Sequence, residues 1–88
     1  MPAYPVPFAI ERDDARRLRL RNGSAETLHW VRVEVAPRGL AWAPLTPRLE
    51  PGAAVEVAVQ GSRLELDSRV IVRWRRPNGE EYLYGIAL

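Results

Sequence analysis

The sequence contains no cysteine and no lysine, and it has a single histidine. The absence of cysteine excludes disulfide bridges, thiolate metal ligands and thiol nucleophiles. Because small secreted domains usually depend on disulfides, this absence favours the cytoplasm. The N-terminus supports the same expectation: prolines at positions 2, 5 and 7 interrupt any apolar run, and no basic start is present, so neither a signal peptide nor a spanning helix is indicated.

All thirteen basic residues are arginines, and eleven acidic residues leave a net charge of only +2. A GC-rich bacterial genome produces the same arginine bias, and we prefer this explanation to nucleic-acid binding. Arg73 and Arg75 are followed closely by Glu80 and Glu81, whereas a groove that tracks phosphates would not alternate in sign so freely. We therefore expect neither a nucleic-acid nor a membrane partner.

Eighty-eight residues are enough for one domain with a modest core and too few for two. The apolar fraction of 47% and the charged fraction of 27% are those of an ordinary globular protein, not of a disordered chain. We expect residues 1–88 to form a single domain, with Met1 to Pro5 as a loosely held lead-in.

Apolar and polar residues alternate with a period of two, and no helical stripe is visible. In the clearest run, Val31, Val33 and Val35 share one face of a predicted strand. The same alternation predicts a larger set of core residues: Leu18, Leu20, Val31, Val33, Val35, Val55, Val57, Val59, Val70, Val72 and Trp74.

Turn signals separate these runs. Asn22-Gly23 ends one strand, and Pro51-Gly52 places proline and glycine in the order that a type II turn requires. Pro77-Asn78-Gly79 indicates a tight hairpin. The stretch from Leu40 to Glu50 is predicted to cross the molecule with at most one short strand. About seven short strands with this spacing are typical of an all-β sandwich or barrel.

Together these motifs resemble bacterial immunoglobulin-like domains of the cell-adhesion-related type, which form modules in bacterial surface proteins. The likeness extends roughly from Ala15 to Ala87. It rests on Asn22-Gly23 before a valine-rich strand, Leu49-x-Pro51-Gly52 before Val55-x-Val57-x-Val59, and Val70-x-Val72-x-Trp74 before the Pro77-Asn78-Gly79 hairpin. It implies a single antiparallel two-sheet sandwich of about seven short strands, an adhesive or architectural role, and no catalytic residues.

Two features depart from antibody-type domains: there is no cysteine pair, and no tyrosine stands near the start of the penultimate strand. Trp30 stands where such domains often bury a tryptophan, but its parity is opposite to that of Val31. Either a bulge precedes Val31, or Trp30 lies on the outer face.

Residues suited to catalysis are few. His29 could join a serine and an aspartate only through Ser24 or Ser68 and Asp67, and no nucleophile-elbow motif or oxyanion loop accompanies them. One histidine and scattered carboxylates lack the spacing of metal ligands. We therefore expect no enzymatic activity, no metal and no cofactor.

The most informative residues are aromatic, apolar or arginine. In an immunoglobulin-like order the third, sixth and seventh strands adjoin in one sheet, and parity turns five of their residues outward. These are Trp30, Arg32, Ile71, Arg73 and Leu83. Tryptophan and arginine are enriched in protein interfaces, so the five form a candidate contact patch. The alternative is ordinary surface, on which Arg32 and Glu34 pair with Arg73 and arginine stems cover Trp30.

Tyr82 and Tyr84 would suit a platform on which sugar rings stack, but they share their parity with Ile86 and are predicted to lie in the core. We expect a small non-catalytic protein–protein interaction module that binds a protein partner or a second copy of itself in a homodimer. The alternative is an adhesive module that binds carbohydrate or a surface.

Overall fold

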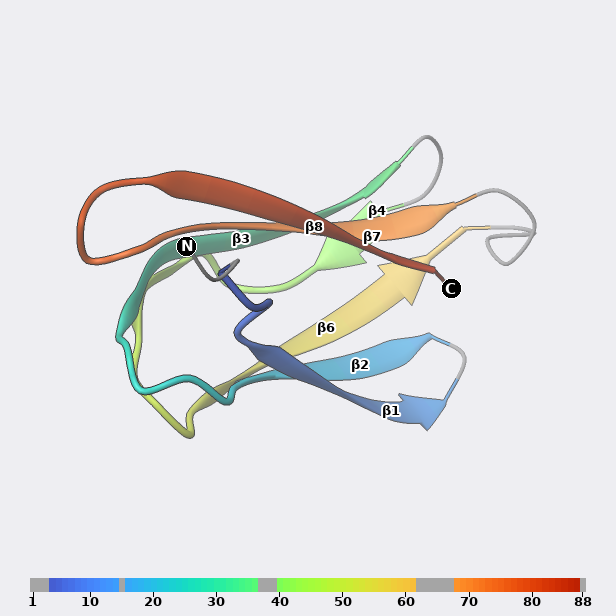
Figure 1. Cartoon of the computed structure of the whole chain (residues 1–88). Helices are drawn as coiled ribbons and strands as arrows, with labels where there is room; N and C mark the ends of the chain where they lie inside the picture. Colours follow the sequence, from blue (N-terminus) through green and yellow to red (C-terminus); the bar gives the residue numbers. More distant parts are fainter. Residues whose placement is uncertain (1–3, 15, 37–39, 62–67, 88) are drawn as a thin grey trace.

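The computed structural model describes residues 4–14, 16–36, 40–61 and 68–87 and arranges them in two antiparallel sheets (Figure 1). The described strands are β1 (Phe8–Asp14), β2 (Arg17–Asn22), β3 (Leu28–Ala36), β4 (Leu40–Trp42), β5 (Thr46–Leu49), β6 (Ala54–Gln60), β7 (Arg69–Arg75) and β8 (Glu81–Ala87). The predicted all-β two-sheet sandwich is confirmed, with eight strands, more than the alternation indicated. Over the described ranges, no helix is long and apolar enough to cross a membrane.

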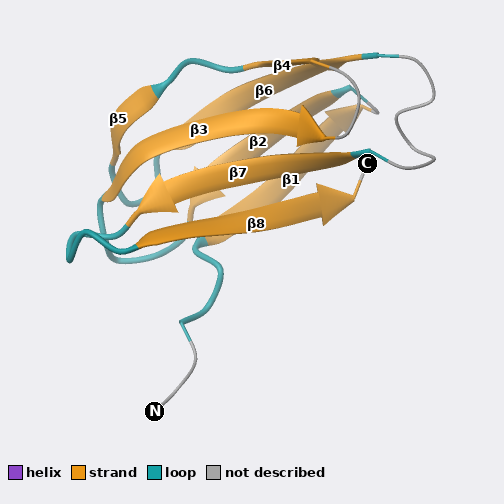
Figure 2. Cartoon of the chain, turned by 90° about the horizontal axis from the view of Figure 1, so that it is seen from above, coloured by secondary structure: helices purple, strands orange, loops and turns teal. Residues whose placement is uncertain are grey.

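Each sheet has four strands. Sheet I has the order β1-β2-β6-β4, and sheet II has the order β5-β3-β7-β8. Figure 2 shows sheet II in front of sheet I. At the centre of each sheet, two strands pair that are far apart in the sequence. These are β2 and β6 in sheet I and β3 and β7 in sheet II. This arrangement is compatible with an immunoglobulin-like fold at a coarse level.

The chain crosses between the sheets three times from β3 to β6. β4 pairs with β6 in sheet I, and β5 then returns to pair with β3 in sheet II. The expectation of at most one short strand here was therefore wrong. Pro44 and Pro47 keep the strands short, because proline has no N–H to donate to a ladder.

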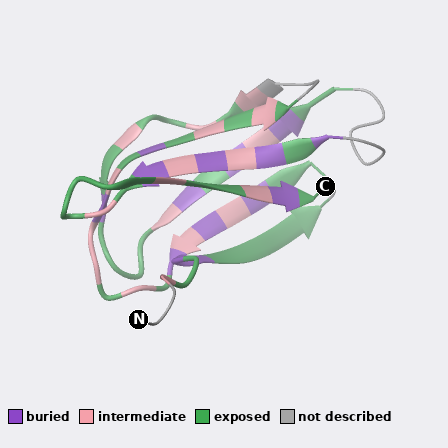
Figure 3. Cartoon of the chain, turned by 45° about the horizontal axis from the view of Figure 1, so that its top comes forward, coloured by how far each residue is buried: buried purple, intermediate pink, exposed green. Residues whose placement is uncertain are grey.

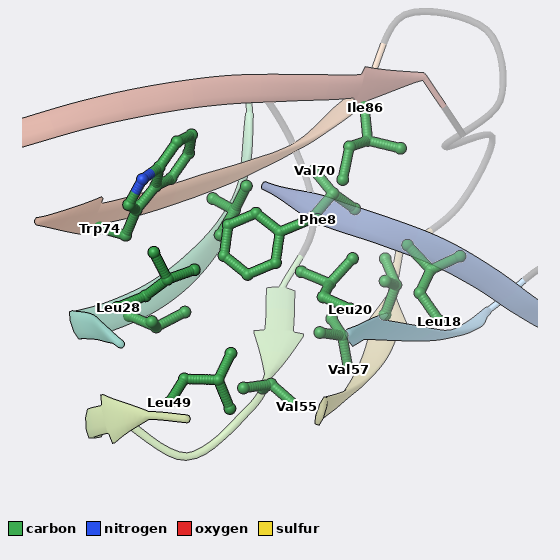
Figure 4. Packing of buried hydrophobic residues seen from close by; sticks show 13 residues of the cluster. Phe8, Leu18, Leu20, Leu28, Leu49, Val55, Val57, Val70, Trp74 and Ile86 are labelled. Carbon is green, nitrogen blue, oxygen red and sulfur yellow. The ribbon is translucent and has the colours of Figure 1, made fainter. Parts of the chain in front are cut away.

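Thirteen apolar side chains fill the space between the sheets (Figure 4). They are Phe8, Leu18, Leu20, Leu28, Val31, Leu49, Val55, Val57, Val59, Val70, Val72, Trp74 and Ile86. Full burial of one such side chain stabilises the fold by about 1.5–3 kcal/mol. Most of the predicted core is confirmed, and Phe8, Leu28 and Leu49 are added to it.

Val33 and Val35 were predicted to be buried, but they are only half-buried and pack on the margin of the core. Their parity is as expected, because they pair with Val72 and Val70 of the neighbouring strand. The difference arises from the opposite sheet. The second half of β3 faces β4, which has only three residues and covers it incompletely.

The two sheet edges on the β1/β8 side are less buried than the centre. Figure 3 shows β1 exposed along most of its length, whereas β7 alternates between buried and less buried residues. On β8, Ile86 is buried and Tyr82 packs on the core, as their parity predicts. Tyr84 has the same parity but is 39% exposed.

The segment before β1 is tied to the β7–β8 end of sheet II by aromatic contacts. The Tyr4 ring lies 4.7 Å from the Tyr82 ring, and the Arg76 guanidinium lies 4.1 Å above the Tyr4 ring centre. Phe8 meets Trp74 edge-on at 5.1 Å. Such ring pairs add about 0.5–1.5 kcal/mol beyond the area that they bury.

Asn22 is a fully buried polar residue at the end of β2. Its Nδ2 donates to the main-chain oxygens of Glu26 at 2.7 Å and Leu49 at 2.9 Å. Its Oδ1 accepts from the Ser24 N–H at 3.0 Å and the Ser24 hydroxyl at 2.7 Å. One side chain therefore shapes the loop before β3 and attaches it to the end of β5.

Candidate functional site

Four of the five predicted patch residues lie together on the outer face of sheet II. Arg32, Arg73 and Leu83 occupy one row across β3, β7 and β8, since Arg73 pairs with both of the others. Ile71 lies in the next row, between Glu34 and Gly85. Leu83 is 57% exposed, whereas Ile71 and Arg73 are half-buried.

The fifth patch residue, Trp30, lies in a β-bulge of β3. Trp30 and Val31 together stand opposite the single residue Trp74 of β7. The flanking pairs are His29–Arg75 and Arg32–Arg73. The bulge thus places Trp30 between two rows of the sheet, next to the row that holds Arg32.

The backbone of Trp30 is left-handed, with φ at +52°, and among the described residues no other non-glycine residue has a positive φ. Trp30 is 50% exposed, while Leu28 and Val31 on either side are fully buried. Both possibilities that its parity allowed are therefore realised. A bulge precedes Val31, and Trp30 lies on the outer face.

Glutamates neutralise the arginines of this face. Arg73 pairs with Glu34 at 3.2 Å, as the ordinary-surface alternative anticipated. Arg32 instead reaches over β7 to Glu81 at 2.8 Å, and Arg75 lies 3.5 Å from the same carboxylate. All three pairs are well exposed, so each contributes only about 0–1 kcal/mol. These ion pairs determine the charge pattern of the face, and they add little to the stability of the fold.

The face has little depth. Its hollow between Arg32, Val33, Glu34 and Arg73 has a volume of about 90 Å³. Pockets for small organic ligands usually measure roughly 300–1,000 Å³. A broad contact with another macromolecule suits this shape better than a small ligand does.

Sequence reasoning overlooked Trp42, which is 61% exposed on β4. Its indole Nε1 donates to the Gln60 side-chain oxygen at 3.3 Å. Beside it, an open hollow of about 510 Å³ is also lined by Asp14, Arg16 and Arg17. Proline-rich surroundings hid the strand that carries Trp42, so no periodicity could place it on the outer face of sheet I.

Three of the residues considered for catalysis, His29, Ser24 and Ser68, lie within the described ranges. His29 lies between Arg75 of β7 and Arg48 of β5. The Ser24 hydroxyl is bonded within the Asn22 loop, and Asp67 lies outside the described residues. In the ranges that the structure covers, no cluster of three or more histidine, aspartate or glutamate side chains could hold a metal ion.

Comparison with protein-family models, with curated proteins and with solved structures found no match to the chain.

Proposed function

We propose that this chain is a small non-catalytic protein-interaction module that binds its partner with the outer face of sheet II. The observation that carries the proposal is the conformation of Trp30, a bulky residue held at φ +52° with half of its surface in water. Strained backbone of this kind gathers at functional sites.

Neither local structure nor burial explains a tryptophan at this position. A left-handed conformation costs a residue with a side chain about 1–2 kcal/mol, and glycine would adopt it without that cost. Burial of the Trp30 indole offsets only part of this conformational cost, because half of the residue remains exposed. A large indole presented on a bulge is well suited to contact another protein, since tryptophan is among the residues that most often dominate binding energy.

The surroundings of Trp30 support a protein partner. Leu83 supplies a second exposed apolar side chain, and Arg32 and Arg73 add guanidiniums that are already paired with carboxylates. An apolar centre with a polar, charge-balanced rim is the usual composition of a protein interface. A phosphate backbone would instead favour unpaired positive charge.

An adhesive, carbohydrate-binding module is the second candidate, and Trp42 is the observation that favours it. Its exposed indole beside a polar hollow resembles the stacking surfaces that bind sugar rings. The resemblance to adhesion-related bacterial immunoglobulin-like domains points the same way. We place this candidate second because the Trp42 backbone shows no strain that would need a functional explanation.

The two candidates are separated by Trp30→Gly and Trp42→Ala, each compared with the parent by quantitative pull-down from bacterial lysate and by binding to immobilised glycans. Trp30→Gly should lose the captured protein and keep its stability within about 1 kcal/mol, because relief of strain offsets the lost contacts. Trp42→Ala, the matched control, should capture the same protein as the parent.

A second variant tests the rest of the patch without touching Trp30. Ile71→Glu combined with Arg73→Glu should reduce capture of the same protein while the melting temperature stays nearly unchanged. Undiminished capture by both patch variants would refute the proposal. Glycan binding that disappears only in Trp42→Ala would favour the adhesive candidate.

A further inference from the structure

The described strands leave four sheet edges, and only one of them is both long and unprotected. β4 has three residues, and β5 has four and contains Pro47. β1 carries a run of charged residues from Glu11 to Asp14 and an irregular register near its end. Shortness, proline, charge and bulges are the devices that protect sheet edges from pairing.

β8 has none of these devices along most of its length. It runs for seven residues without proline or arginine, and its one charged residue is Glu81 at the start. Leu83 and Tyr84 in its middle are 57% and 39% exposed. A strand of this kind is a template on which another strand can pair.

The hairpin shows which main-chain groups of β8 point outward. The Arg76 N–H donates to the Glu80 oxygen at 2.9 Å, which makes these two residues a hydrogen-bonded pair. Because bonded and non-bonded pairs alternate in an antiparallel ladder, Tyr82, Tyr84 and Ile86 bond to β7. The N–H and C=O groups of the odd-numbered residues, Leu83 among them, therefore point away from the sheet.

The last of these outward-pointing groups, the Ala87 carbonyl, already has a hydrogen-bond partner. The Arg12 side chain, from β1 of the opposite sheet, donates from Nη2 to the Ala87 oxygen at 2.7 Å. This bond confirms that the Ala87 carbonyl points outward, as the alternation requires. It also closes the C-terminal end of the edge and leaves the stretch from Glu81 to Gly85 open.

We propose that two copies of this chain associate by antiparallel pairing of β8 with β8, with the two-fold axis at Leu83. The two copies of sheet II would then form one continuous sheet. The proposal rests on the proposed function only in treating sheet II as a protein-binding surface. It names a second copy as the partner at the edge, and it does not use Trp30.

The register follows from the outward groups and from Arg12. With the axis at Leu83, the two Leu83 residues form a hydrogen-bonded pair and Glu81 of each copy bonds to Gly85 of the other. This gives about six main-chain hydrogen bonds, two for each bonded pair. Moving the axis to Tyr84 would place Glu81 opposite Ala87 and displace the bond from Arg12.

The side chains of β8 complement themselves in this register. The two exposed Leu83 side chains meet on the outer face, and each Tyr82 lies opposite the Tyr84 of the other copy, as aromatic pairs across strands prefer. A methyl group added at Gly85 would meet the Arg69 Cδ at 3.7 Å, so the Arg69 side chain lies over Gly85. Glu81 of the second copy would approach Gly85 from the other side, which brings its carboxylate near the positively charged Arg69.

The first experiment measures the mass of the full chain by sedimentation equilibrium over a range of concentrations. The parent should reach twice its chain mass of 10.0 kDa. Leu83→Lys should raise the dissociation constant about 100-fold, because two lysines would meet on the axis. Leu45→Lys is the matched control, since Leu45 is 58% exposed outside the strands, and it should dimerise like the parent.

The second experiment tests the register. The chain has no cysteine, so Leu83→Cys and Leu45→Cys each introduce a single thiol. A short bifunctional thiol reagent should link the Leu83→Cys variant into dimers and leave the Leu45→Cys variant monomeric.

The outcomes separate this inference from the proposed function. A parent that stays monomeric at every concentration, or a dimer that survives Leu83→Lys and is not linked through Leu83→Cys, would overturn the edge pairing. Trp30→Gly should keep the dimer intact. If it loses a captured protein and still dimerises, the face and the edge act independently. If it dimerises and captures as the parent does, only the proposal for the face fails.

Discussion

Trp74 donates its indole Nε1–H to the hydroxyl oxygen of Tyr4 at a distance of 3.1 Å. Trp74 lies in β7 and is almost fully buried, whereas Tyr4 precedes the first strand. Because a buried indole N–H needs an acceptor, this bond holds Tyr4, and with it the segment before β1, against the core between the two sheets.

Tyr4→Phe tests this bond, since it removes the acceptor and keeps the ring contacts. The Trp74 N–H would lose its partner in a buried position, which costs about 1–3 kcal/mol. The free energy of unfolding in urea should fall by that amount. Tyr84→Phe is the matched control and should change stability much less, because Tyr84 is exposed. Equal stability of the two variants would show that the bond contributes nothing.

The same hydroxyl predicts a dependence on alkaline pH. Burial raises the pKa of Tyr4 above its ordinary value of 10.0, and the nearby Glu26 carboxylate raises it further, against the lowering effect of the Trp74 hydrogen bond and of Arg76. The folded state therefore holds the phenol proton more tightly than the unfolded state. This contribution to stability is complete below pH 10.0 and is lost as the pH rises through the raised pKa.

Unfolding in urea, measured at a series of pH values on both sides of 10.0, checks this dependence. The parent should lose stability more steeply above pH 10.0 than Tyr4→Phe does, because only the parent carries the phenol. If both proteins show the same slope, Tyr4 is not the responsible group.

Asn22→Leu should destabilise the fold strongly. The change removes two donors and an acceptor from a fully buried site, so the main-chain oxygens of Glu26 and Leu49 lose partners together. We expect a loss of about 2–5 kcal/mol in the free energy of unfolding, measured by chemical denaturation. Asn78→Ala, in the exposed hairpin turn, should cost far less. A comparable loss in both variants would contradict the special role of Asn22.

His29→Ala should leave both fold and binding intact. The side chain is only half-buried and lies between Arg75 of β7 and Arg48 of β5. The free energy of unfolding should change by about 1 kcal/mol or less, as for most surface positions. A hydrolase or nuclease activity in the purified parent that vanishes in this variant would disprove the assignment as a non-catalytic module.

For β2, β3, β6 and β7, the alternation of residues was enough to predict which side of the strand faces the core. Leu18, Leu20 and Val72 are buried as their parity indicated, because a one-residue shift would have buried arginine. The parity of a residue predicts which face of the strand its side chain occupies, but not how deeply that side chain is buried. Val33 points inward yet stays half-buried, since its burial depends on how far β4 extends in the opposite sheet.

Features that depend on distant parts of the chain were not predictable. Asn22 was identified as a turn residue, but the acceptor on Leu49 that explains its burial is brought in by β5. The contact patch was predicted from parity alone, and parity correctly placed Arg32 and Ile71 on the outer face of sheet II. The left-handed conformation of Trp30 gave no local signal, because glycine and asparagine are the residues that ordinarily indicate it.

The bulge at Trp30 also determines how β3 tolerates changes in length. In a regular strand, deleting one residue turns every side chain beyond the deletion to the opposite face. Removal of Trp30 alone would bring Leu28 and Val31 into regular alternation and would keep the flanking pairs between β3 and β7 in register. The pairing of β3 with β5 would shift instead, because it runs without a break from Leu28–Leu49 to Val31–Thr46. A deletion at Trp30 would therefore move the irregularity from the β3–β7 pair at the centre of sheet II to the β3–β5 pair at its edge, where the strand has only four residues.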